Sequence, residues 1–170
     1  MAKWMIEPLV GIGPLKFGML RDLVRAELGP DYQVFKKTPD SLNDSDAYDR
    51  ISVHCYYDVQ DRLDFIEIAY DSILSIEFKG VNFFDVAVPI LLDHMKTAGH
   101  LGTISHDGCY FEDTGIAIYS PQSVKIEAVS AYSSERFSVF LALMQQVAER
   151  RRLRALKRQA GGGQPKNPFG

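Results

Sequence analysis

The sequence predicts an α+β protein in which antiparallel sheets carry helices on one face and a further helix closes the chain. Two observations predict this class. Helix-spaced and strand-like segments follow one another in the order helix, strands, helix, strands, helix. Short connections rich in Gly, Asp, Ser and Pro separate the strand-like runs, which is typical of hairpins. The composition, 46% hydrophobic and 24% charged, indicates a globular domain with a hydrophobic core.

The first half begins with a turn-rich entry segment, residues 5–18, that has room for one short strand. Residues 19–28 keep apolar side chains at helical spacing and end at Gly29-Pro30, which predicts a short helix. A short strand over 31–36 and a polar loop over 37–49 follow. The runs 51–57, 63–70 and 73–78 then predict an antiparallel meander.

The second half repeats this plan. Residues 86–98 predict a helix capped by Asp85, with Pro89 in its first turn and Gly99 just beyond its end. Strands are expected at 102–106, 109–112, 115–120 and 124–132. A closing helix is expected to begin at Ser133 or Ser134 and to run into the basic stretch RRRLRALKR.

The expected domain organisation is a single domain over 1–158 with two half-repeats, 11–82 and 83–132, and a C-terminal helix over 134–158. The Gly/Pro-rich end, 159–170, is expected to be disordered. A sheet covered by helices on one side leaves its other face free, and such a face is a common binding surface.

A local motif adds a resemblance. The run GIGPLKFGM at 11–19, followed by VRAELG at 24–29, resembles the opening of a group of poorly characterised bacterial proteins, some of them candidate immunity proteins for secreted toxins. The plan is also similar to BamE/SmpA-type modules and to the tandem repeat of the β-lactamase inhibitor protein. The resemblance implies a tandem α/β fold that binds another protein through a sheet, without catalysis. This chain departs from that plan at Leu20, where a Ser or Thr helix cap often stands.

The sequence lacks the patterns of membrane-spanning, secreted and well-known catalytic proteins. No apolar run has the length of a membrane span, and the N-terminus does not resemble a signal peptide, so a cytoplasmic location is expected. The two cysteines, Cys55 and Cys109, lie in apolar stretches and are expected to be reduced and buried. No catalytic or phosphate-loop signature is present, and neither a cofactor nor a metal is expected.

An alternative enzyme hypothesis depends on His106, Asp107 and Cys109. His106 and Cys109 flank the Asp107-Gly108 turn and could approach each other, as in a small hydrolase or a metal site. The other histidines, His54, His94 and His100, do not have ligand spacing. A hairpin with a half-exposed histidine explains the same residues more simply.

Charge is distributed unevenly along the chain. Residues 1–149 contain twelve basic and 22 acidic residues, whereas 150–170 contain seven basic residues and no acidic one. Between positions 40 and 71 there are nine acidic and two basic residues, with tyrosines interleaved. Such a run suits a solvated loop and sheet edge, but it also suits a surface that attracts a basic partner.

The function expected from these patterns is that of a non-catalytic protein-binding protein, of the cytoplasmic immunity type, that neutralises a basic, toxin-like partner. The predicted contact residues are Asp44, Asp46, Tyr48, Asp49, Tyr56, Asp58, Asp61, Asp64, Glu67 and Tyr70. A third hypothesis assigns nucleic-acid or anionic-lipid binding to the basic tail. The acidic body opposes nucleic acid, and cations also suit a solvated helix end.

Overall fold

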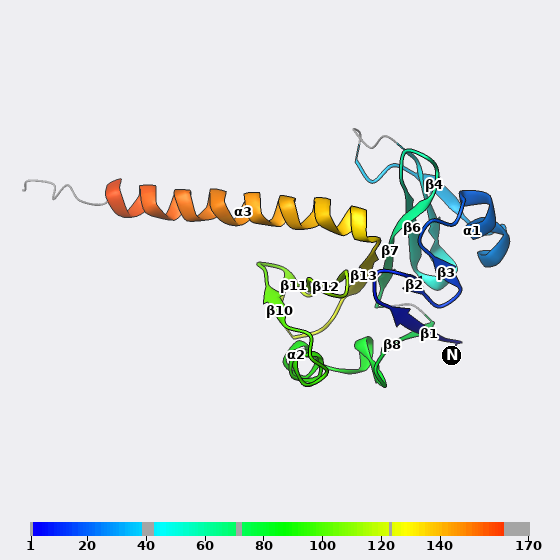
Figure 1. Ribbon diagram of the computed structural model, residues 1–170, viewed down its shortest axis with the longest axis horizontal. Helices are drawn as coiled ribbons and strands as arrows, with labels where there is room; N and C mark the ends of the chain where they lie inside the picture. The colour runs from blue at the N-terminus through cyan, green and yellow to red at the C-terminus, as the bar shows by residue number, and fades with distance from the viewer. Residues whose placement is uncertain (1, 39–42, 71–72, 123, 162–170) are drawn as a thin grey trace, which may run out of the picture. The chain divides into compact units, whose positions relative to one another are not determined.

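The computed structural model describes residues 2–38, 43–70, 73–122 and 124–161. Within them the α+β class is confirmed, with an eight-stranded sheet, a five-stranded sheet and three α-helices (Figure 1). Contacts divide the chain into two units, Met1–Phe137 and Ser138–Gly170. Both sheets belong to the first unit.

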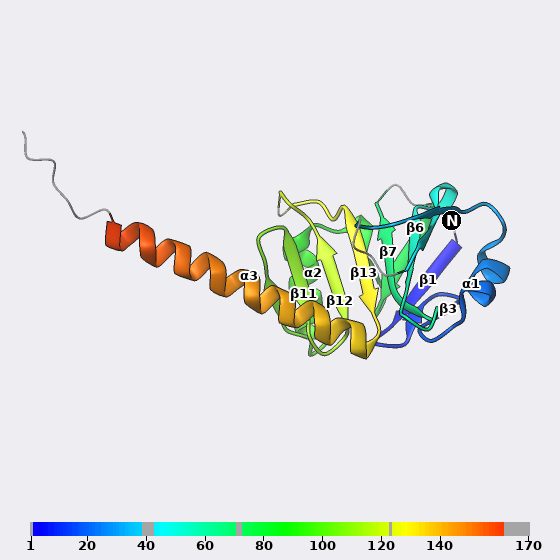
Figure 2. The same cartoon turned by 90° about the horizontal axis from the view of Figure 1, so that it is seen from above.

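The eight-stranded sheet joins two antiparallel meanders. Its strands, in spatial order, are β10 (Gly102–Ile104), β11 (Gly108–Phe111), β12 (Ile116–Tyr119), β13 (Ala128–Tyr132), β7 (Leu63–Ala69), β6 (Val53–Tyr57), β5 (Ser45–Tyr48) and β4 (Gln33–Phe35). The last strands of the two meanders, β7 and β13, pair antiparallel with Glu67 opposite Ser130 (Figure 2). A helix precedes each meander, as the tandem plan predicts.

The five-stranded sheet is built around a parallel pair. Its order is β3 (Leu15–Lys16), β2 (Gly11–Ile12), β1 (Ala2–Glu7), β8 (Leu74–Phe78) and β9 (Val81–Asn82). The run 73–78 was expected to continue the first meander, and this was wrong. It pairs with β1, so that Trp4 lies opposite Ile76, and β13 takes the free edge of β7 instead. Four of the five β8 residues are buried, which requires cover on both faces.

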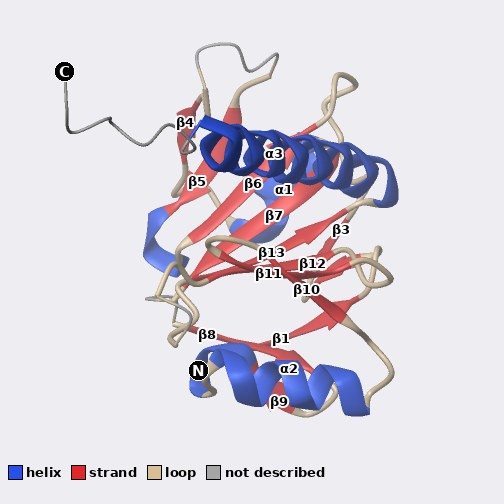
Figure 3. Cartoon of the chain, turned by 90° about the vertical axis from the view of Figure 1, so that its left-hand side faces the viewer, coloured by secondary structure: helices blue, strands red, loops and turns tan. Residues whose placement is uncertain are grey.

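One hydrophobic core is shared by the two sheets and the first two helices. Figure 3 shows these elements coloured by secondary structure. The eight-stranded sheet contributes alternate residues to it, among them Val53, Cys55, Ile66 and Ile68. Because successive side chains of a strand point to opposite faces, the residues between these lie on the other side of the sheet. We call that side, which carries His54 and Glu67, the outer face.

The first two helices contribute small apolar faces to this core. In α1 (Arg21–Leu28) Val24 is fully buried, and Gly29 ends the helix with a φ of 92°. In α2 (Val88–Thr97) the buried residues are Val88, Leu91 and Met95. Asp85 does not cap α2 as expected. It belongs to the 3-10 turn η2 (Phe83–Asp85), while Ala87 occupies the cap position without a side-chain hydrogen bond.

The expected loop over 37–49 contains a strand. Its last part forms β5, all four residues of which are buried between β4 and β6. The sequence Ser-Asp-Ala-Tyr has low strand propensity, so local preference did not reveal it. Tertiary pairing overrides that preference here.

The closing helix α3 spans Ser134–Gly161. Ser133 Oγ accepts a hydrogen bond from the backbone N–H of Arg136 at 3.2 Å, which confirms the expected helix start. Of the predicted tail, 162–170 lies outside the described residues. No helix among the described residues is long and apolar enough to cross a membrane.

Candidate functional site

Four of the seven acids of the run 40–71 that the structure describes form ion pairs with cations from outside the run. The carboxylate of Asp46 is fully buried and lies between Arg21 at 3.3 Å and Arg25 at 2.8 Å. The hydroxyl of Tyr57 also donates to it, at 2.9 Å. Arg21 pairs in addition with Asp61 at 2.6 Å. These contacts tie α1 to β5 and to the β6–β7 turn.

Three of the predicted contact residues are buried. Asp46 has no exposed surface, Tyr48 retains 2% and Tyr56 retains 5%. Side chains with so little solvent exposure are not available for contact with a partner in this conformation. Burial raises the pKa of both tyrosines.

The predicted acids in and around the β6–β7 turn have local structural roles. Asp58 Oδ1 accepts hydrogen bonds from the backbone N–H groups of Gln60 and Arg62. Asp64 is mostly buried, 4.0 Å from Arg136, and burial raises its pKa to about 6. Asp44 is exposed, and its backbone carbonyl accepts a hydrogen bond from Arg21. Asp40 and Asp71, counted in the acidic run, lie outside the described residues.

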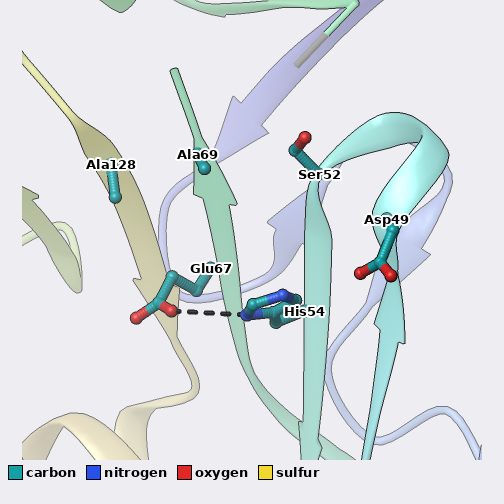
Figure 4. Close-up of a pocket in the computed structure, with 6 residues that line it drawn as sticks. All are labelled: Asp49, Ser52, His54, Glu67, Ala69 and Ala128. Atoms are coloured by element: carbon teal, nitrogen blue, oxygen red, sulfur yellow. Dashed lines mark ion pairs between the residues drawn. The ribbon is translucent and has the colours of Figure 1, made fainter. Parts of the chain in front are cut away.

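Two of the predicted contact residues, Asp49 and Glu67, line a depression on the outer face. The depression, of about 310 Å³, is lined by Asp49, Ser52, His54, Glu67, Ala69 and Ala128 (Figure 4). Ala69 and Ala128 lie opposite each other on β7 and β13. Because an alanine side chain is a single methyl group, this pair leaves space on the face of the sheet. The four polar residues border that space.

Local backbone conformation positions the polar residues at the rim of this depression. Asp49 begins the 3-10 turn η1 (Asp49–Ile51), and Ser52 follows it in the left-handed region with a φ of 52°. The chain then enters β6, where His54 lies opposite Glu67 of β7. Asp49 Oδ2 accepts a hydrogen bond from Gln33 at 3.0 Å, and among the described residues Asp49 has no ion pair.

Glu67 is held as a carboxylate. His54 Nδ1 lies 3.6 Å from its Oε1, and Lys37 Nζ lies 3.1 Å from its Oε2. The Tyr56 hydroxyl donates to Oε1 at 3.3 Å. Burial opposes ionisation, but the hydrogen bonds and charges of His54 and Lys37 outweigh it and lower the pKa of Glu67 to about 2.

A row of stacked aromatic rings crosses the outer face beside Glu67. The Tyr56 and Phe65 rings stack with centroids 4.4 Å apart, and those of Phe65 and Tyr132 with centroids 4.3 Å apart. Lys37 Nζ lies 4.4 Å from the Tyr56 ring centroid. All three rings of the row are buried.

Tyr70 is the predicted contact residue that is exposed beyond the end of β7. Its side chain is 43% exposed, and Lys125 Nζ lies 3.2 Å above its ring centroid. Asp49, Glu67 and Tyr70 therefore remain accessible or partly accessible on or next to the depressed region. The sequence did not reveal Ala128, because it lies nearly sixty residues along the chain from its partner Ala69.

The described residues do not support the Cys109 chemistry of the alternative enzyme hypothesis. Cys109 is 2% exposed, its neighbours on β12 and β13 contribute to the core, and burial raises the pKa of its thiol to about 11. A thiol in this state is protonated at neutral pH and is a poor nucleophile and metal ligand. No group of three metal-binding side chains converges within the described part of the chain.

The arrangement on the outer face also lacks the contact that nucleophilic catalysis requires. Ser52 and His54 lie near each other at the rim, but no hydrogen bond joins them among the described residues. A nucleophile and its base lie within hydrogen-bond reach in most such sites.

Comparison with protein-family models, with curated proteins and with solved structures gives no match to this chain. The resemblance to immunity-type proteins therefore gains no support from relatives.

Proposed function

We propose that this chain is a non-catalytic protein-binding protein and that the partner inserts a basic side chain into the depression of the outer face. The observation that carries the proposal is the depression itself. Its lining includes the pair of alanines, Ala69 and Ala128, and the carboxylates of Asp49 and Glu67. At about 310 Å³ it is at the lower limit of small-molecule sites, which favours a single side chain of a protein as its occupant.

Charge supports a basic partner. Residues 1–137 contain twelve basic and 21 acidic residues, a net charge of −9. Glu67 is already paired with Lys37 and His54, so Asp49 supplies the uncompensated carboxylate at the rim. The negative electrostatic field of this unit accelerates association with cationic proteins, and added salt weakens that field. A secreted toxin is the partner class that the sequence resemblance implies, and the negative charge of this unit favours a basic one.

Co-expression with the product of the neighbouring gene tests this function. The wild-type chain should retain that product on an affinity resin at low salt, and Asp49→Lys or Ala128→Trp should abolish retention. Asp93→Lys is the matched control, because Asp93 is exposed on α2 and the charge change is identical. Loss of retention in Asp93→Lys to the same extent, or no retention by the wild type at any salt concentration, would overturn the proposal.

A further inference from the structure

The second unit, Ser138–Gly170, has a charge opposite to that of the first. It contains seven basic residues and one acidic residue, Glu149. Six of the cations lie on the described part of α3, and all six are exposed: Arg150, Arg151, Arg152, Arg154, Lys157 and Arg158. Glu149 pairs with Arg152 at 3.7 Å. The positive charge of this helix end is therefore almost entirely uncompensated.

Five of these cations share one side of the helix. At about 100° per residue, the side chains of Arg150, Arg151, Arg154, Lys157 and Arg158 fall within an arc of roughly 120°. Arg152 lies outside that arc. From Arg150 to Arg158 the helix rises about 12 Å. We call these five residues the basic stripe.

In the part of the chain that the structure describes, half of the twelve cations of the first unit, unlike the basic stripe, form an ion pair with a carboxylate. These cations are Lys3, Lys16, Arg21, Arg25, Lys37 and Arg136. Among the described residues the stripe has no ion pair. Like charges three and four residues apart destabilise a helix, so an anion bound from outside would relieve that repulsion.

We propose that the basic stripe binds the phosphate backbone of duplex nucleic acid, independently of base sequence. Four of its five residues are arginines, whose planar guanidinium donates two parallel hydrogen bonds to a phosphate. An α-helix fits the major groove of a duplex, which is about 12 Å wide. Salt-dependent contacts between cations and phosphates account for binding of this kind.

The pattern of apolar residues argues against an anionic membrane as the target. A helix that lies in a membrane surface needs one apolar side along its length. In α3 the apolar residues lie mainly before the stripe, and Val139 and Leu143 fall on the same side as the stripe. Leu153 and Leu156 are about half exposed and lie outside the arc of the stripe, Leu153 close to its edge. Two half-exposed leucines beside the stripe do not form a continuous apolar side along the helix.

Fluorescence anisotropy of the full chain with a labelled duplex DNA of mixed sequence tests the proposal. Wild-type protein should bind at low salt, and the logarithm of the binding constant should fall with log salt with a slope of about −4.5 for five phosphate contacts. Arg150→Gln/Arg154→Gln/Arg158→Gln should bind at least about tenfold more weakly, with a slope shallower by about 2.7. Circular dichroism would show that the variant keeps its helix.

The matched control removes three exposed cations of the first unit, Lys36→Gln/Arg50→Gln/Lys96→Gln, and changes the net charge equally. It should leave the slope unchanged. Three results would overturn the proposal: no binding of the duplex by wild type at low salt, equal weakening in the control, or binding to phosphatidylserine vesicles without binding to the duplex.

Discussion

Arg25 donates two hydrogen bonds to the fully buried carboxylate of Asp46, from Nε to Oδ2 at 2.9 Å and from Nη2 to Oδ1 at 2.8 Å. This paired geometry fixes α1 against β5. The hydrogen bonds to Asp46 also raise the pKa of Arg25. Arg21 approaches the same carboxylate, so one buried acid holds two cations of one helix.

Removal of the Asp46 carboxylate should therefore strongly destabilise the first unit. Asp46→Ala leaves two partly buried guanidinium groups without their shared anion, and we expect the free energy of unfolding to fall by about 3 kcal/mol. Asp61→Asn, which removes the charge of the exposed partner of Arg21 and tolerates the left-handed φ of 61° at this position, should cost less than about 1 kcal/mol. Urea denaturation followed by circular dichroism measures both. A similar loss of unfolding free energy in the two variants would show that the buried Asp46 carboxylate contributes no more to stability than the exposed one of Asp61.

Glu67 should make stability depend on acid pH. Its pKa is lowered to about 2 in the folded chain, below its usual value, so the folded state binds fewer protons than the unfolded state. The stabilisation is fully present above about pH 4.5 and is lost as the pH falls towards 2. Glu67→Gln should lower the free energy of unfolding by about 2 kcal/mol at pH 7 and by much less near pH 2.

The exposed Glu27 of α1 provides the control for Glu67. Glu27→Gln should change stability little at either pH. A Glu67→Gln effect that is as large at pH 2 as at pH 7 would mean that packing, and not the ion pairs with His54 and Lys37, holds Glu67 in place.

Asp64 should have the opposite effect on stability. Burial raises its pKa to about 6, so the folded state holds a proton that the unfolded state has lost. Its contribution to stability therefore falls as the pH rises from about 4 to 6. Its Oδ1 is buried without a hydrogen-bond partner. Asp64→Asn should raise the free energy of unfolding by about 1 kcal/mol at pH 7 and leave it unchanged near pH 3.5. A decrease at pH 7 would indicate that the pair with Arg136 outweighs burial.

The two cysteines should be unreactive in the folded protein. Both are buried, and burial raises both thiol pKa values, to about 11 for Cys109. With a thiol-reactive disulfide at pH 7.5, native protein should react slowly and denatured protein should titrate two thiols. The Cys55→Ala variant isolates Cys109. Rapid reaction of native Cys55→Ala would revive the His106–Cys109 hypothesis.

The ion-pair partners of the acidic run could not be predicted from the sequence. The excess of acids between 40 and 71 is real, but a count along the chain cannot show which cations meet them in space. Arg21, Arg25, Lys37 and Arg136 all come from outside that run. Of the seven acids of the run that the structure describes, four are thus paired, whereas Asp49, at the rim of the depression, has no ion pair.

The sequence by itself determined the α+β class, the stop of α1 at Gly29, the position of Pro89 in the first turn of α2 and the start of α3 near Ser133. These features depend on local periodicity and on backbone preferences that neighbouring residues express. Only the tertiary structure decided that β8 pairs with β1, that β7 pairs with β13 and that Ala69 lies opposite Ala128. Those pairings join residues about sixty or more positions apart, and they are selected by burial of the shared core, which no local pattern encodes.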